Sequence, residues 1–134
     1  MTLARVLLLL GALIFVFIGV VFLAAPVEWA RVVQIELPTP MARTDLRATY
    51  GGFDLGFGVF LALCAFRREW LRPGLAAAGV GLAGFGLARS FGMVAEGAAS
   101  PLMVSLAVAE LSGAIAAGLS YRRLGRTGIP PGRM

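Results

Sequence analysis

The stretch VLLLLGALIFVFIGVVFLAA, from Val6 to Ala25, decides the fold of this chain because it contains no charged residue. A bilayer core is about 30 Å thick, and a helix that rises 1.5 Å per residue needs about 20 apolar residues to cross it. The apolar core of a secretory signal peptide is about 7–15 residues long, so this stretch is too long to be one. The end of the stretch also lacks the small residue that signal cleavage requires three positions before the cut. We therefore predict a retained transmembrane helix.

Three further apolar stretches meet the same test of length. The chain has 134 residues, of which 59% are hydrophobic and 14% charged, so little sequence remains outside the four stretches. We predict an all-α fold, an integral membrane four-helix bundle that forms one domain over residues 1–134. The expected spans are about 6–25, 47–66, 73–93 and 102–119, followed by a disordered basic tail at about 122–134.

The arginines predict how the bundle is oriented. The sequence has 12 basic residues, and all of them are arginines. Loops rich in basic residues stay in the cytoplasm. One side of the predicted bundle has three arginines, Arg31, Arg43 and Arg47, and the other side has eight. The larger group consists of Arg5, Arg67, Arg68, Arg72, Arg122, Arg123, Arg126 and Arg133. We expect both termini in the cytoplasm (N-in/C-in), in a multi-pass protein of the bacterial inner (plasma) membrane.

The composition argues against several classes of site. The chain has no histidine and one cysteine, Cys64, so we expect no metal site and no internal disulfide. A GxGxxG match at 79–84 lies inside an apolar span with no strand before it, which argues against a dinucleotide. We expect no cofactor. The net charge of +5 does not predict nucleic-acid binding, because the arginines stand at helix ends where membrane topology explains them.

The loop at 26–46 is the only long connection between the predicted spans. Its pattern predicts a short amphipathic helix that starts at Pro26 and ends at Pro38, with Trp29 at the depth of the lipid headgroups. This segment is either a connector on the membrane surface or a lid over an outward-facing pocket.

Three ionisable residues, Asp54, Arg89 and Glu110, lie inside predicted spans. Each costs about 2.5–3.5 kcal/mol at the centre of a helix, so it should face protein rather than lipid. Side chains lean toward the N-terminus of their helix, so Arg89 points deeper while Asp54 and Glu110 point outward. We expect all three side chains to meet about 8–12 Å below the outer surface.

Two more polar residues extend this cluster toward water. Arg47 and Tyr50 share one stripe of the second span with Asp54, at i, i+3 and i+7. The formal charges balance, with Arg47 and Arg89 against Asp54 and Glu110. Such a cluster either binds a ligand or a proton, or it only fixes the packing and register of the helices.

The same residues carry a resemblance to a known family. They are Asp45-x-Arg47-x-x-Tyr50-Gly51-Gly52, Leu55-Gly56-x-Gly58, Gly86-x-x-Arg89-x-x-Gly92 and Glu110. This pattern resembles the bacterial four-helix membrane family known as domain of unknown function 4345, over about residues 5–122. The resemblance implies a small inner-membrane protein without an established activity. The architecture is also similar to DoxX-like proteins, some of which are linked to thiol or quinone metabolism, but a single cysteine offers no dithiol.

Small residues in these helices predict close helix packing, which lets backbones approach where lipid provides no hydrophobic drive. The glycines expected to serve this purpose are Gly51, Gly52, Gly56, Gly58, Gly86 and Gly92.

The leading functional hypothesis is a non-enzymatic binding or accessory module for an amphiphile, a lipid or a partner helix, with no catalytic residue. Arg47 and Arg89 would hold an anionic group, Glu110 and Asp54 would fix the arginines, and Tyr50 would offer a hydrogen bond. One alternative is a proton-coupled exporter of small molecules that uses Glu110 and works as a homo-oligomer. A lesser alternative is a membrane enzyme that acts on a lipid or quinone. Membrane lipid or a partner membrane protein are the expected partners.

Overall fold

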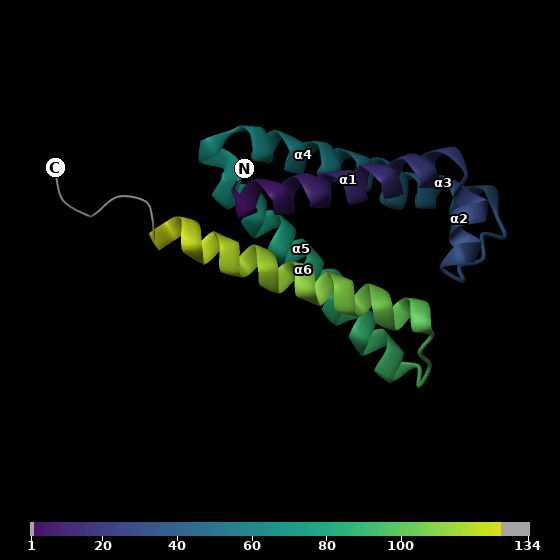
Figure 1. Cartoon of the computed structure of the whole chain (residues 1–134). Helices are drawn as coiled ribbons and strands as arrows, with labels where there is room; N and C mark the ends of the chain where they lie inside the picture. The colour runs from purple at the N-terminus through teal and green to yellow at the C-terminus, as the bar shows by residue number, and fades with distance from the viewer. Residues whose placement is uncertain (1, 127–134) are drawn as a thin grey trace.

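The computed structural model of this protein describes residues 2–126, and every regular element in that range is helical (Figure 1). In chain order the elements are α1 (Leu3–Ala24), α2 (Pro26–Val32), α3 (Pro40–Leu46), a π-helix η1 (Arg47–Phe53), α4 (Asp54–Phe66), a 3₁₀ turn η2 (Arg68–Trp70), α5 (Leu71–Ala95) and α6 (Pro101–Arg126). Because α3, η1 and α4 run on without a break, and η2 leads directly into α5, the described residues form four long helices. All four are long and apolar enough to cross a membrane. This confirms the predicted all-helical fold with four such helices.

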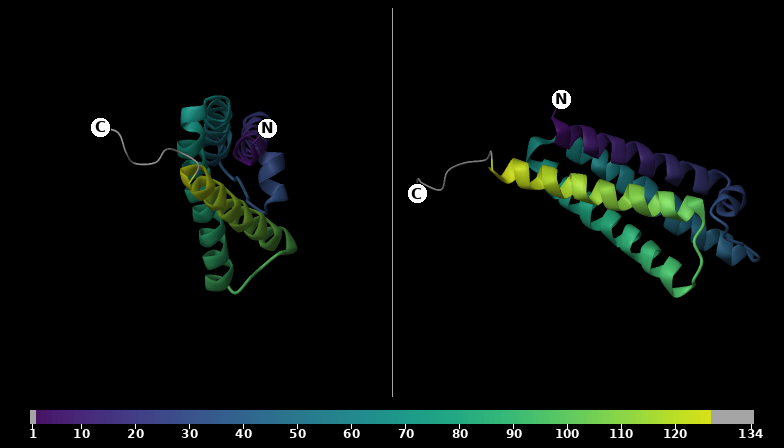
Figure 2. Two further views of the ribbon diagram at one scale, coloured as in Figure 1. Left: turned by 60° about the vertical axis from the view of Figure 1, so that its left-hand side comes forward. Right: turned by 60° about the horizontal axis from the view of Figure 1, so that its bottom comes forward.

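The four long helices form two pairs that diverge. α1 is packed along α4, and α5 is packed along α6. Figures 1 and 2 show that the pairs lie close together at the end that holds the N-terminus and separate toward the other end. We call these the closed end and the open end. The main core lies at the closed end, where all four helices contribute buried side chains, among them Leu8, Leu61, Leu75 and Ala117.

Glycines set the close approach within each pair. A Cβ atom added at Gly19 of α1 would lie 2.5 Å from the Leu55 backbone nitrogen, and one at Gly58 would lie 2.8 Å from the backbone nitrogen of Val16. Real Cβ atoms do not approach backbone atoms this closely, so α1 and α4 can be this near to each other only with glycine at both positions.

The other predicted packing glycines divide into two groups. Gly51 and Gly86 also lie at close contacts, against the side chains of Leu23 and Leu111 respectively. A Cβ atom at Gly52 would have ordinary contact distances, and one at Gly56 or Gly92 would meet no atom within 4 Å. The structure therefore gives no support for a packing role of the last three. Their helix faces point away from a neighbouring helix in the described part of the chain.

The loop after α1 differs from its prediction at one end. The short helix α2 begins at Pro26 as expected, but it ends at Val32 and not at Pro38. Gln34 has a φ of 62°, and the N–H groups of Gln34 and Ile35 donate to the carbonyls of Arg31 and Ala30. This is a Schellman motif, which ends a helix by satisfying its last carbonyl groups without a proline.

A small second core lies at the open end. Ala30 of α2 and Leu46 of α3 pack with Phe22 near the end of α1. The ring of Trp29 contacts that of Phe17, with centroids 5.8 Å apart. These contacts hold α2 and α3 against α1, so the loop folds back onto its own pair of helices.

Two helix boundaries differ from the predicted spans. The second long helix starts at Pro40, before the expected Arg47, because the Thr39 hydroxyl caps it by accepting a hydrogen bond from the Ala42 N–H. α6 continues to Arg126, so the first part of the predicted disordered tail is helical. There the Arg72 guanidinium lies over the Tyr121 ring at 4.5 Å and stabilises the last turns. The rest of that tail, 127–134, lies outside the described residues.

Candidate functional site

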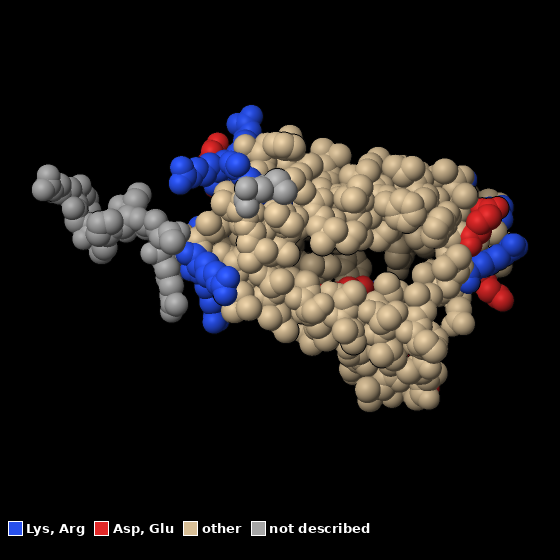
Figure 3. Space-filling view, in the orientation of Figure 1, with Lys and Arg blue, Asp and Glu red and all other residues tan. Residues whose placement is uncertain are grey.

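A hollow lies between the two helix pairs where they begin to separate. It has a volume of about 600 Å³ and is almost entirely apolar. Its lining residues come from η1, α4 and α5: Phe53, Phe57, Ala77, Val80, Gly81, Gly84, Phe85 and Ala88. We call this hollow the groove. The space-filling view shows that the upper and lower halves of the molecule are separated by an opening, with an acidic side chain visible inside (Figure 3).

A smaller cavity adjoins the groove and contains its polar groups. It has a volume of about 360 Å³ and is lined by Ala48, Thr49, Tyr50, Phe53, Asp54 and Phe85. We call it the side pocket. Because Phe53 and Phe85 line both spaces, the groove and the side pocket are neighbours. Together they offer an apolar space with one carboxyl and two hydroxyl groups along its edge.

The π-helix η1 supplies most of the side pocket. It spans Arg47–Phe53 and includes Gly51 and Gly52, which have weak intrinsic preference for an α-helix. π-helical turns are rare, and they occur frequently at functional sites. The sequence analysis did not predict this turn.

Arg89 and Glu110 form a bidentate ion pair between α5 and α6. The Arg89 Nε donates to Glu110 Oε2 at 3.0 Å, and Nη2 donates to Oε1 at 2.7 Å. The side chains are 24% and 14% exposed, so both are largely shielded. A Cβ atom at Gly86, one turn before Arg89, would lie 3.3 Å from the Glu110 Cβ. Glycine at this position lets the two helices come close enough for the pair to form.

A thioether completes the surroundings of Arg89. Its Nη1 donates to the Met103 Sδ at 3.3 Å. A guanidinium has five N–H groups, and three of them have partners among the described residues. Met103 was not among the site residues predicted from the sequence. Its position seven residues before Glu110, on the same face of α6, is the signal that could have placed it beside the pair.

Asp54 lies apart from this ion pair. The residue is 5% exposed, and the part of the chain that the structure describes offers its carboxylate no hydrogen bond or ion pair. Its oxygens are not among the side-chain atoms that are both sealed off and unpaired. The carboxylate therefore keeps a small accessible surface, and Asp54 is one of the residues that line the side pocket.

Arg47 and Tyr50 complete the set of predicted site residues. The Arg47 Nε donates to the carbonyl oxygen of Leu23 at 3.1 Å, which ties η1 to the end of α1. The Tyr50 ring packs on Phe22 with centroids 5.1 Å apart, and the residue is 38% exposed.

The structure thus gives the predicted cluster a different internal arrangement. Arg89 and Glu110 meet as expected, but Asp54 does not join them and Arg47 binds a backbone carbonyl. The expectation of one balanced group of four charges is wrong for the described residues. The physical reason is that Asp54 belongs to the α1/α4 pair, while Arg89 and Glu110 belong to the other pair, and the two pairs diverge at this level.

The aromatic lining is the part of the site that the sequence analysis missed. Phe53, Phe57 and Phe60 form a row of rings along one helix, with centroids 6.0 and 6.2 Å apart. Their spacing of four and three residues places them on one face, and this pattern is visible in the sequence. Because phenylalanine is equally common on surfaces that face lipid, the spacing alone could not assign the row to a groove.

Fold and site together define a class: small helical proteins with four helices long enough to cross a membrane and an apolar groove between two helix pairs. The chain belongs to the family described as Domain of unknown function (DUF4345), whose model matches residues 3–121. This confirms the family resemblance seen in the sequence. No curated protein and no solved structure matches the chain, and the similarity to DoxX-like proteins stays a prediction.

Proposed function

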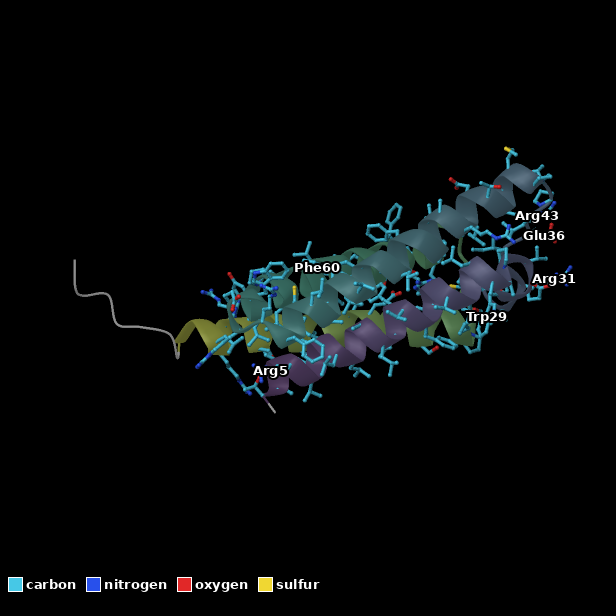
Figure 4. The ribbon with its side chains drawn as sticks, turned by 90° about the horizontal axis from the view of Figure 1, so that it is seen from above. Arg5, Trp29, Arg31, Glu36, Arg43 and Phe60 are labelled. Atoms are coloured by element: carbon cyan, nitrogen blue, oxygen red, sulfur yellow. The ribbon has the colours of Figure 1, made fainter. Side chains whose placement is uncertain are left out.

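We propose that this protein is an integral protein of the bacterial inner membrane with both termini in the cytoplasm. The distribution of arginines supports this orientation. Basic side chains dominate the closed end, whereas acidic and basic side chains mix at the open end (Figure 3). Figure 4 shows Arg5 at the closed end and Trp29, Arg31, Glu36 and Arg43 gathered at the open end. By the positive-inside rule the closed end faces the cytoplasm, so the groove lies near the middle of the membrane and the side pocket in its outer half.

The function that the geometry supports best is non-enzymatic binding of an amphiphile or lipid between the two helix pairs. The observation that carries this proposal is the groove itself, which has a volume of about 600 Å³ and an apolar lining. Binding pockets for small molecules are typically about 300–1,000 Å³, mostly apolar, with a few polar groups that fix orientation. The side pocket provides those polar groups through Tyr50, Asp54 and Thr49.

The roles expected for the two arginines change with the structure. Arg89 is held by both oxygens of Glu110, so its charge is already compensated. Arg47 donates to a backbone carbonyl and lies exposed above the side pocket. We therefore assign the Arg89–Glu110 pair to bracing α5 against α6, and we no longer assign the arginines to an anionic ligand. The exporter alternative gains no support from Glu110. To carry a proton or a substrate, its carboxylate would first have to break both hydrogen bonds with Arg89.

Native mass spectrometry of protein extracted in mild detergent tests the proposal. We expect the wild type to retain a lipid or an added amphiphile. The variant Gly84→Leu places a side chain in the groove at a position where an added Cβ meets no atom within 4 Å, so the fold can accept it. It should lower the retained fraction severalfold.

Gly92→Leu is the matched control for this experiment. Gly92 lies on the same helix, two turns further on, and has equally open surroundings, but it does not line the groove. Retention in this variant should equal that of the wild type. Equal retention in the Gly84→Leu variant, or a wild type that binds no added amphiphile, would contradict the proposal.

A further inference from the structure

We infer that the groove selects lipophilic organic cations, with the Asp54 carboxylate as counter-ion and the rings of Tyr50 and Phe85 beside the cationic head. This inference rests on the proposed function and adds the chemical class of the ligand. Three observations carry it: an unpaired buried carboxylate, the charge balance around it, and the aromatic walls of the side pocket.

The first observation is that Asp54 is buried without a partner. It is 95% shielded by its surroundings, and no described residue donates to it or pairs with it. A buried charge is costly unless it is paired or hydrogen-bonded. A cation that enters the side pocket supplies the missing partner. Asp54 lines that pocket and its carboxylate keeps an accessible surface, so a cation in the pocket can reach it.

The second observation is the sign of the remaining charge. Arg89 and Glu110 line neither cavity, and their charges cancel each other in a bidentate pair. Arg47 lies about two helical turns nearer the open end, where its side chain is exposed and donates to Leu23. Asp54 is therefore the uncompensated charge that lines the side pocket among the described residues, and the pocket attracts positive groups.

The third observation is the composition of the pocket walls. Three of the six residues that line the side pocket are aromatic: Tyr50, Phe53 and Phe85. Aromatic faces attract cations, and this attraction is strongest where water is excluded. The cavity of about 360 Å³ has room for a substituted ammonium or phosphonium head. The neighbouring groove of about 600 Å³ can take the apolar body of the same molecule.

Two hydrophobic ions of nearly equal shape and opposite charge test this inference. Tetraphenylphosphonium is the cationic probe, and tetraphenylborate is the anionic one. Binding of each is measured by equilibrium dialysis against the full chain in dodecyl maltoside. We expect the wild type to bind the cation at least about tenfold more tightly than the anion, because a charge contact in a partly buried site exceeds the energy that corresponds to this ratio.

Single substitutions test which residue causes the preference for the cation over the anion. Asp54→Asn should lose the preference for the cation, while Asp54→Glu should retain most of it. Asp45→Asn is the matched control, because Asp45 is an exposed carboxylate on α3 outside both cavities, and its loss should leave the preference unchanged. Phe85→Leu should weaken cation binding severalfold through loss of one aromatic wall. If Asp54→Asn fails to fold, the Asp54→Glu and Phe85→Leu variants still decide the question.

The outcomes separate this inference from the proposed function. Equal binding of both ions by the wild type, or a cation preference that survives Asp54→Asn, would overturn the cation site and leave an unselective groove. Binding of neither ion by a wild type that still retains lipid would overturn it as well. A wild-type protein that retains no lipid refutes the proposed function itself. A preference that disappears only with the carboxylate supports the inference.

Discussion

The ion pair between Arg89 and Glu110 allows a quantitative test of how the α5/α6 pair is held together. The pair has two charge-assisted hydrogen bonds, at 3.0 and 2.7 Å, and both side chains are less than one quarter exposed. Glu110→Gln leaves the guanidinium charge without a counter-ion. Removing one partner of a buried pair costs about 3–5 kcal/mol, so the free energy of unfolding should fall by about that amount. Arg89→Gln should cost a similar amount, because it isolates the carboxylate.

The double variant Arg89→Gln/Glu110→Gln decides whether these costs come from isolated charges. It removes both charges and retains two amides that can bond to each other. Its cost should therefore be well below the sum of the single costs, with a coupling energy of about 2 kcal/mol or more. Unfolding in mixed micelles of SDS and dodecyl maltoside, followed by circular dichroism, measures all three variants. Glu96→Gln, which changes an exposed glutamate after α5, is the control and should be neutral.

Two results would refute this reasoning. If each single substitution costs less than about 1 kcal/mol, the ion pair lies in a solvent-exposed environment, where ion pairs contribute little to stability. Additive costs in the double variant would show that the two residues stabilise the helices independently of each other. Either result would remove the bracing role assigned to the pair.

Three further predictions follow from the geometry. Gly58→Ala should destabilise the protein by several kcal/mol, because its Cβ would meet the Val16 backbone nitrogen at 2.8 Å, whereas Gly56→Ala should be neutral or slightly stabilising; chemical unfolding compares them. Asp54→Asn should raise the free energy of unfolding by about 1 kcal/mol or more, because it removes an unpaired buried charge; a loss of stability in the same assay would point to a structural role. Green fluorescent protein fused to the C-terminus should fluoresce, and alkaline phosphatase fused there should be inactive, if the closed end faces the cytoplasm.

The positions of the helices were predictable from the sequence, because the hydropathy and length of each apolar stretch can be judged from that stretch alone. A helix such as α1, with no charged residue after Arg5, has one physical solution in a membrane, whatever its neighbours do. The pairing of Arg89 with Glu110 was also predictable, since depth and the lean of side chains toward the N-terminus place them at one level. Both inferences use distances along helix axes, which the sequence contains.

How the helices lie side by side was not predictable from the sequence, because distances along the helix axes do not determine it. The same depths placed Asp54 with the ion pair, but depth does not say which helix pair a residue belongs to or how far the pairs diverge. Which helices pair closely depends on contacts such as the one between Gly19 and Leu55, which show only in three dimensions. The Schellman motif at Gln34 was hidden similarly, because a non-glycine residue with positive φ leaves little trace in the sequence.

The unfavourable features of this chain are concentrated in one short segment, η1 together with Asp54. η1 contains two adjacent glycines, each of which lowers helix stability by about 1 kcal/mol relative to alanine. The turn is π-helical, and Asp54 at its end is buried without a partner. Arg89 and Glu110 form a bidentate ion pair, so the chain is able to pair its buried charges. Proteins depart from locally optimal structure mainly at functional sites. The segment from Arg47 to Asp54 is therefore where a ligand would gain most from binding, because the buried carboxylate of Asp54 has no partner among the described residues.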